Sequence, residues 1–312
     1  MTTVPVPKIG IALNEALLIS DAAERRSLIS RIDASGLDHV TTGDHISFQG
    51  GHGFDGMISA MNVLAANDRL KVLIGVYLAG LRHPMATARQ LSTISQLAPG
   101  RLVLGAGVGG EDRSEISNAG VNPATRGRRL DETLGLLRQL AMGDAVDHEG
   151  EFFTLENARV VPAPEPRIPL VIGGAGDAAI QRTATYGDGW LGIFCSSRRF
   201  ADTVEKIRAA TAEQGRPDPS WFGVSMWVGL GNDGDRARAL LGERMQALYN
   251  LPPEKFQNVT AAGTPEQVAE QLLPFVAGGA EHLTVVTVAE NPHEGIELAG
   301  EVRRILQKSC TQ

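Results

Sequence analysis

The chain has 312 residues, 43% of them hydrophobic, and can bury a large core as one α/β domain or two smaller ones. Its 29 Lys+Arg and 36 Asp+Glu give a formal net charge of −7, which argues against nucleic acid as the main partner. Two distant cysteines, no signal-peptide start and no run of ~20 apolar residues argue against a disulfide framework and a membrane protein, and they predict a cytoplasmic one.

Short apolar runs alternate with helix candidates along the whole chain. The expected strands are residues 8–14, 39–45, 71–78, 101–108, 169–174, 189–194, 221–230 and 282–288. The expected helices are residues 21–35, 55–67, 84–98, 125–142, 177–187, 198–214, 264–278 and 293–308. Unbroken apolar strands that alternate with helices predict a parallel sheet covered on both faces. Eight such units favour a (β/α)8 barrel in a single domain, residues 1–312, with an open doubly wound sheet as the alternative.

Two segments exceed what a barrel requires. Residues 147–164 predict a small β excursion after the fourth helix. Residues 233–263 predict a helical insertion between strands seven and eight. Insertions at such points shape either a site or an oligomer contact, and the sequence leaves both open.

An acid and an imidazole, Asp44 and His45, stand side by side where the second predicted strand ends. In a parallel barrel, catalytic groups lie at the carboxyl ends of the strands. Histidine is the side chain best suited to transfer a proton near neutral pH, whereas a rim histidine with a structural hydrogen bond is the alternative. A metal site is not expected, because His39 and His45 lie ~20 Å apart along a strand.

Two glycine-rich stretches follow other predicted strands. In "GAGVGG" (105–110), glycines such as Gly107 and Gly109 let a flat or phosphorylated ligand approach the backbone, unless they merely form a tight strand–loop junction. In "GGAG" (173–176), the strand runs into a helix opened by Asp177, and free N–H groups at such a start bind phosphate. The alternative is a plain turn, and Asp177 is expected to cap the helix.

Five motifs, taken in order, resemble the bacterial luciferase-like flavin oxidoreductase family. They are "GDHI" (43–46), "LRHPMATARQLSTISQLAPGRLVLGAGVGG" (81–110), "RGRRLDETLGLLRQL" (126–140), "IPLVIGGAGDAAIQRTATYGDGW" (168–190) and "AAGTPEQVAEQLLPFVAGGAEHLTVV" (261–286). The resemblance covers roughly residues 8–306. It implies a (β/α)8 barrel that binds FMN or the deazaflavin coenzyme F420 (also written F-420) at the barrel mouth.

The resemblance also implies roles for individual residues. The residues expected to contact the cofactor are Asp44, Gly75, Val76, Gly107, Gly109, Gly174, Ala175, Gly176 and Asp177. Gly174, Ala175, Gly176 and Asp177 would hold the cofactor phosphate. Gly107 and Gly109 would lie against the ring and ribityl chain. Strand three would carry a strained bulge behind the ring at Gly75-Val76-Tyr77, and His45 would act as the acid and base.

The chain departs from relatives that oxidise a sugar phosphate. Those relatives carry a glutamate where Gly110 stands here, followed in this chain by Glu111, and a tryptophan where Gln49 stands. The departures argue against sugar-phosphate oxidation.

We therefore expect a homodimeric oxidoreductase that transfers hydride between coenzyme F420 and a small organic substrate. Arg198 and Arg199 would meet the anionic tail that distinguishes F420 from FMN, with a solvated helix start as the alternative. One alternative function is an FMN-dependent monooxygenase supplied with reduced flavin by a separate reductase. Others are a cofactor-free barrel lyase or isomerase and a non-catalytic flavin-binding protein.

Overall fold

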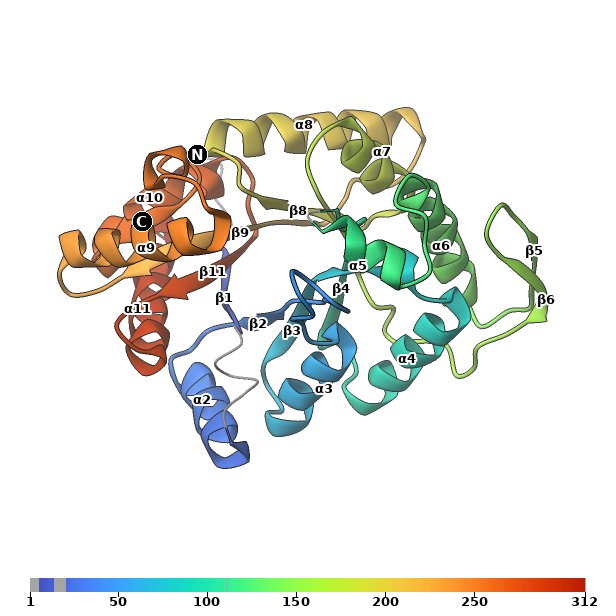
Figure 1. Ribbon diagram of the computed structural model, residues 1–312, viewed down its shortest axis with the longest axis horizontal. Helices are drawn as coiled ribbons and strands as arrows, with labels where there is room; N and C mark the ends of the chain where they lie inside the picture. Colours follow the sequence, from blue (N-terminus) through green and yellow to red (C-terminus); the bar gives the residue numbers. More distant parts are fainter. Residues whose placement is uncertain (1–5, 14–20, 111, 312) are drawn as a thin grey trace. The chain divides into compact units, whose positions relative to one another are not determined.

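Strands and helices alternate along the chain as predicted (Figure 1). The fold class is a (β/α)8 barrel. The structure is a computed structural model that describes residues 6–13, 21–110 and 112–311. Asn14, at the end of the first predicted strand, and Glu111 lie outside the described residues. The chain divides into two compact units, unit 1 of Met1–Thr41 with Trp190–Gln312 and unit 2 of Thr42–Gly189. The expectation of one domain stays a prediction.

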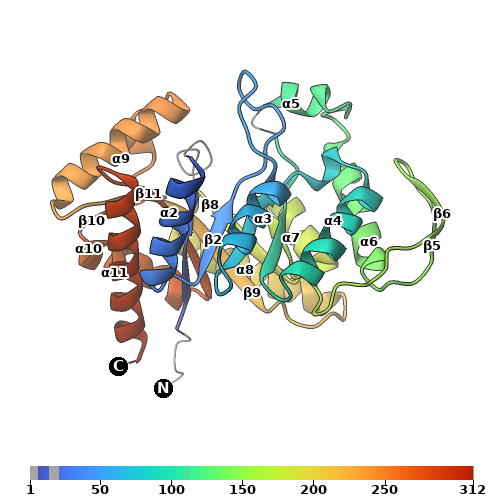
Figure 2. The ribbon, with the colours of Figure 1, turned by 90° about the horizontal axis from the view of Figure 1, so that it is seen from below.

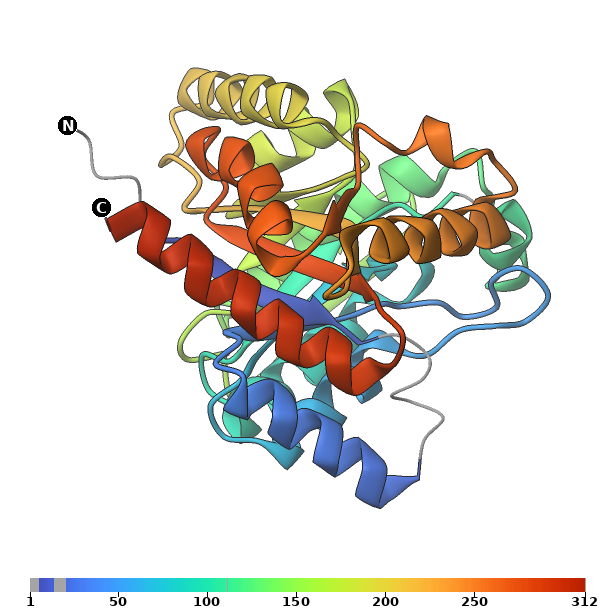
Figure 3. The same cartoon turned by 90° about the vertical axis from the view of Figure 1, so that its left-hand side faces the viewer.

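Unit 1 is built on a mainly parallel sheet with the order β10-β9-β11-β1-β2, and β8 also pairs with β9. Its strands are β1 (Lys8–Ala12), β2 (His39–Thr42), β8 (Gly189–Ile193), β9 (Trp221–Leu230), β10 (Ala261–Gly263) and β11 (His282–Val288). Its helices are α2 (Ala22–Ala34), α8 (Ser197–Glu213), α9 (Gly234–Tyr249), η2 (Pro253–Lys255), α10 (Pro265–Ala277) and α11 (Pro292–Thr311). Figure 3 shows α11 running between α10 and α2, with which it packs.

Unit 2 contains three parallel strands in the order β3-β4-β7 and an antiparallel hairpin. The strands are β3 (Lys71–Tyr77), β4 (Leu102–Ala106), β7 (Leu170–Gly173) and, in the hairpin, β5 (Val146–Glu149) and β6 (Thr154–Ala158). The helices are α3 (Gly56–Ala66), η1 (Ala79–Leu81), α4 (Pro84–Leu97), α5 (Arg113–Asn118), α6 (Arg126–Leu140) and α7 (Asp177–Tyr186).

The local signals in the sequence are matched by local geometry. Strands β9 and β11 have the predicted bounds. Helix α10 begins with the capping box that Thr264 and Gln267 form, as their spacing indicates. The β excursion is the hairpin β5–β6, and the insertion before β11 contains α9, η2 and the short strand β10. The short elements η1 and α5 were not predicted, nor was β10, since residues 233–263 were expected to be helical.

Strand β3 carries the irregularity that the resemblance implies. Its register against β4 shifts between Ile74 and Tyr77. The peptide bond between Gly75 and Val76 is cis.

The interior of each unit is apolar. Several of the largest fully buried side chains come from strands, such as Phe222 of β9 in unit 1 and Tyr77 of β3 in unit 2. No helix in the described part of the chain is long and apolar enough to cross a membrane.

Candidate active site

His45 stands on the loop that leaves β2 and leads to α3. All four residues of β2 are buried, so the chain emerges from the interior at Thr42, three residues before His45. The His45 N–H donates to Phe54 O at 3.1 Å, which closes the loop on itself. The His45 side chain is 40% exposed, and its ring packs on Phe48 with centroids 4.3 Å apart. The imidazole is therefore held in place yet open to a ligand.

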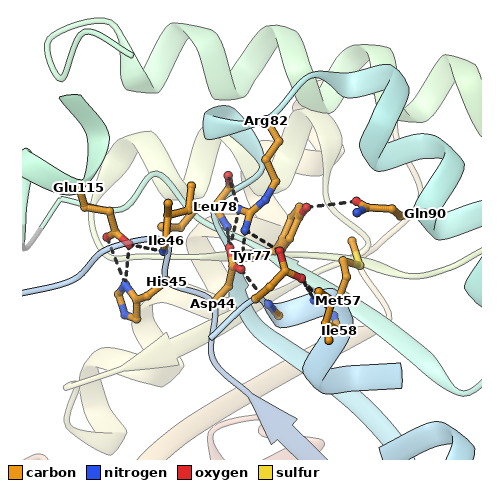
Figure 4. Close-up of polar contacts among 12 residues, drawn as sticks. Asp44, His45, Ile46, Met57, Ile58, Tyr77, Leu78, Arg82, Gln90 and Glu115 are labelled. Carbon is orange, nitrogen blue, oxygen red and sulfur yellow. Dashed lines mark hydrogen bonds and ion pairs between the residues drawn. The ribbon is translucent and has the colours of Figure 1, made fainter. Parts of the chain in front are cut away.

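A buried glutamate fixes the orientation of that imidazole. The Glu115 side chain is 3% exposed, and its Oε1 and Oε2 lie 3.2 Å and 3.1 Å from Nδ1 of His45 (Figure 4). Oε1 also accepts the N–H groups of Ile46 at 2.7 Å and Ser47 at 3.2 Å. Because a carboxylate only accepts hydrogen bonds, Nδ1 carries the proton in the neutral imidazole, and Nε2 is left as an acceptor.

The short helix α5 brings Glu115 to the loop. Figure 2 shows α5 beside the loop that precedes α3. Asp112 caps α5 by accepting the N–H of Ser114 at 2.8 Å, and its other carboxylate oxygen accepts the N–H of Gln49 at 2.8 Å. Asp112 and Glu115 thus both bind the loop that carries His45.

Asp44 lies behind the loop, and hydrogen-bond donors of the protein itself occupy both of its carboxylate oxygens. Its two oxygens form a bidentate pair with Arg82, with both N–O distances 2.8 Å (Figure 4). They also accept the N–H groups of Gly56 and Leu78 at 2.8 Å each. Arg82 donates further to Asp55 at 3.0 Å, at the start of α3. With four donors on a carboxylate that is 0% exposed, Asp44 anchors the loop, and its predicted cofactor contact stays a prediction.

Tyr77 completes this buried group. The guanidinium carbon of Arg82 lies 4.3 Å from the centre of the Tyr77 ring, and the Tyr77 hydroxyl donates to Gln90 at 3.4 Å. Burial, opposed by the nearby positive charge of Arg82, raises the pKa of Tyr77 to about 12. Tyr77 is therefore a neutral hydrogen-bond donor near pH 7, and it covers the ion pair from the interior.

Three glycines at the ends of β4 and β7 lie against the irregular part of β3. A Cβ atom placed on Gly107 or Gly173 would lie 2.5 Å from the Val76 side chain, and one on Gly105 would lie 2.3 Å from Ile74 O. Only glycine fits at such distances. The irregular part of β3 thus packs closely on the ends of β4 and β7, and the expected contacts of Gly75, Val76 and Gly107 with a cofactor stay predictions.

The loop after β4 continues with Gly109 and Gly110, at φ 65° and 141°. A Cβ atom on Gly109 would meet the Leu78 side chain at 3.3 Å, and one on Gly110 would meet Arg126 at 3.4 Å. Glu111, which follows, lies outside the described residues. The expected contact of Gly109 with the cofactor stays a prediction.

The loop after β7 has the backbone of an anion site. Gly174 and Gly176 have φ of 115° and 90°, a conformation that favours glycine. Gly176 is the N-cap of α7 and Asp177 is its first residue, with no side chain capping the helix. The expectation that Asp177 caps the helix is therefore wrong, because the chain enters the helix one residue earlier. A Cβ atom on Gly176 would meet nothing within 4 Å, so the helix start, next to Ala175, is open.

Arg198 and Arg199 lie in the first turn of α8 in unit 1, and both are exposed. Ser196 caps this helix by accepting the N–H of Arg199 at 3.3 Å. The loop after β7, with Gly174 and Gly176, belongs to unit 2. The expected contact of the two arginines with a cofactor tail stays a prediction.

Sequence reasoning missed two residues that hold the site together, Glu115 and Arg82. Asp112-Arg113-Ser114-Glu115 has the spacing of a capping box and predicts a helix start after the glycines. That signal locates α5, but no local pattern links Glu115 to His45, 70 residues away. Arg82 gives no local signal, because its partner Asp44 lies 38 residues earlier.

The fold and this site define a (β/α)8-barrel enzyme with its chemistry at the carboxyl ends of the strands. The chain belongs to the luciferase-like monooxygenase family, whose model matches residues 9–251. The family that the motifs indicate is thereby confirmed.

Similarity to individual proteins extends over nearly the whole chain. The chain is 27% identical over 297 residues to the F420-dependent glucose-6-phosphate dehydrogenase of Rhodococcus erythropolis, covering 84% of this chain and 87% of the relative. It resembles an F420-dependent secondary alcohol dehydrogenase in complex with an F420–acetone adduct, with a TM-score of 0.84 and 18% identity over 96% of this chain and 99% of that chain.

A third similar structure is a type II Baeyer–Villiger monooxygenase from Pseudomonas putida, the oxygenating constituent of 3,6-diketocamphane monooxygenase, in complex with FMN. Its TM-score is 0.79 at 16% identity over 97% of this chain and 98% of that chain. These likenesses confirm the predicted barrel.

Proposed function

We propose that the protein is an oxidoreductase that transfers hydride between coenzyme F420 and a small organic substrate, with His45 as the acid and base. The observation that carries the proposal is the half-exposed imidazole of His45, fixed through Nδ1 by the buried Glu115. The named relatives, which depend on F420, support the choice of cofactor.

The chain's own part in the reaction is the movement of a proton. When a substrate hydroxyl is oxidised to a carbonyl, its proton passes to Nε2 of His45, and the carboxylate of Glu115 stabilises the imidazolium that forms. In the reverse direction, Nε2 returns the proton to the oxygen. When bound, F420 supplies the acceptor or donor of the hydride at the substrate carbon.

The residues of unit 2 fit such a cofactor. Gly107 and Gly173 let the side chain of Val76 pack against the ends of β4 and β7, and we assign this stretch of β3 to the flat ring of the cofactor. Gly174, Ala175, Gly176 and the first N–H groups of α7 suit a phosphate, because the helix start is open and its dipole favours an anion. Arg198 and Arg199 are the cations that we assign to the anionic tail of F420.

The alternative is an FMN-dependent monooxygenase that receives reduced flavin from a separate reductase. The FMN complex of the Pseudomonas putida relative favours it, because the same glycines suit a ring and phosphate of either cofactor. We further propose a cytoplasmic homodimer, and a reductase as partner if FMN is the cofactor.

Titration of the purified protein with F420 and FMN side by side distinguishes the F420-dependent oxidoreductase from the FMN-dependent monooxygenase. We expect F420 to bind, with a change in its absorbance, and F420-dependent turnover to follow with a suitable alcohol or carbonyl compound. Tight FMN binding without F420 binding would refute the proposal and favour the monooxygenase.

A further inference from the structure

The loop that carries His45 folds back on itself and places an aromatic ring against the imidazole. The Phe48 N–H donates to His52 O at 2.7 Å, and the His52 N–H donates to Phe48 O at 2.8 Å. Gly50 and Gly51, at φ 90° and 101°, form the turn between them. The backbone of Phe48 is thereby fixed by two hydrogen bonds, three residues after His45.

The Phe48 ring covers one face of the His45 imidazole. The ring centroids are 4.3 Å apart, and the two planes are tilted by only 31°. This separation lies within the ~6 Å over which the face of an aromatic ring attracts a cation. Glu115 holds the Nδ1 edge of the same imidazole at 3.1 Å. The two neighbours therefore act on different parts of the ring, one on an edge and one on a face.

Other side chains of the site do not share this role. Arg82 is paired with Asp44 and Asp55, and Asp112 binds backbone N–H groups. Within residues 6–13, 21–110 and 112–311, Glu115 and Phe48 are the side chains in hydrogen-bond or ring contact with the imidazole of His45.

Proton transfer turns the contact with Phe48 into a charged one. In the proposed reaction the proton of the substrate hydroxyl moves to Nε2 of His45, and the neutral imidazole becomes an imidazolium. Water cannot solvate the face that Phe48 covers, so the π electrons of the phenyl ring take the place of that water. The neutral imidazole gains less from the same contact, because it presents no net charge to the ring. Phe48 thus favours the state that follows proton transfer.

We propose that Phe48 is a positioning residue for His45, whose ring holds the imidazole toward Glu115 and stabilises the imidazolium that forms when His45 accepts the substrate proton. The inference rests on the proposed function, because it requires His45 to be the acid and base. Cation–π contacts at partly exposed sites correspond to about a two- to fivefold change in a rate. We expect this effect on kcat and not on KM, because Phe48 acts through the imidazole.

Substitutions that keep or remove the aromatic ring test this role. Phe48→Tyr and Phe48→Trp keep a π face, whereas Phe48→Leu and Phe48→Met keep an apolar side chain without one. The matched control is Phe153→Leu, because Phe153 also contacts a histidine, His83, but edge to face, with centroids 5.3 Å apart and planes at 80°. Thermal melting of each variant identifies those that fold like the parent.

We expect both non-aromatic variants of Phe48 to lower kcat about two- to fivefold at unchanged KM. Both aromatic variants and the control Phe153→Leu should keep the parent kcat. In the His45→Ala background, Phe48→Leu should cause no further loss of turnover, because a residue that acts only through the imidazole then has nothing to act on.

A measurement without cofactor tests the contact itself. In the nuclear magnetic resonance spectrum of the parent, the ring current of Phe48 should shift the signals of the His45 ring protons upfield. Their loss in His45→Ala identifies these signals. Phe48→Leu should abolish the shift, and Phe153→Leu should leave it unchanged.

Four results would each overturn the inference: the parent kcat in both non-aromatic variants, equal losses in aromatic and non-aromatic variants, a further loss in the His45→Ala background, or the absence of the ring-current shift from the parent. Full turnover in His45→Ala would overturn the proposed function instead. Loss of turnover in His45→Ala together with the parent kcat in Phe48→Leu and Phe48→Met would overturn this inference alone.

Discussion

The pairing of His45 with Glu115 makes Glu115→Gln the most informative single substitution. Glutamine keeps the length of the side chain and an oxygen that can accept the N–H groups of Ile46 and Ser47. It removes the negative charge and presents an amide N–H₂ group to Nδ1, which favours the tautomer with the proton on Nε2. In that tautomer, Nε2 cannot take a proton from a substrate.

The size of the effect follows from the distance between the two groups. At the 3.1 Å between Nδ1 and Oε2, a pair of unit charges interacts with about 5 kcal/mol at an effective dielectric constant of ~20 and about 1.3 kcal/mol at ~80. His45 is 40% exposed and Glu115 is 3% exposed, so an intermediate value of about 2–3 kcal/mol applies. We therefore expect kcat to fall roughly 30- to 160-fold.

The assay compares kcat, KM and cofactor affinity of the parent and the variant with the same substrate. Glu132→Gln is the matched control, because Glu132 pairs with His148 at 3.0 Å and accepts the N–H groups of Phe152 and Phe153 beside the β5–β6 hairpin. The control should keep the parent kcat, and both variants should keep the parent affinity for F420. An unchanged kcat in Glu115→Gln, or equal losses in the two variants, would refute the reasoning.

Three further changes test the remaining assignments. His45→Ala should lower turnover by a factor of ~10²–10⁴ with little change in folding or cofactor affinity, and a variant with full turnover would leave the histidine a structural role. Gly176→Val should weaken the binding of F420 far more than that of its dephosphorylated analogue. The control Gly120→Val, at a similar φ of 78°, should leave the affinity for both ligands unchanged. Equal losses of affinity for both ligands in Gly176→Val would exclude a phosphate contact. Arg198→Ala combined with Arg199→Ala should weaken F420 but not FMN, and added salt should reduce the difference from the parent. Unchanged F420 affinity in that double variant would remove the arginines from the site.

The features that the sequence determined by itself are those that depend on neighbours along the chain. Apolar runs such as 221–230 and 282–288 became β9 and β11 with the same bounds, because a fully buried parallel strand must be apolar throughout. Thr264 and Gln267 began α10 as their spacing predicts. The glycines of the two loops and His45 at the end of β2 followed from the same local signals and from the family resemblance.

Only the tertiary structure decided how those pieces act together. The sequence places an acid beside His45, and the natural expectation is that Asp44 and His45 share the site. Adjacent residues point in different directions where a strand ends, so Asp44 turns inward to Arg82, and Glu115, from a helix 70 residues away, holds the imidazole. Such pairs depend on which strand ends meet, and that is a property of the folded chain which no short stretch of sequence contains.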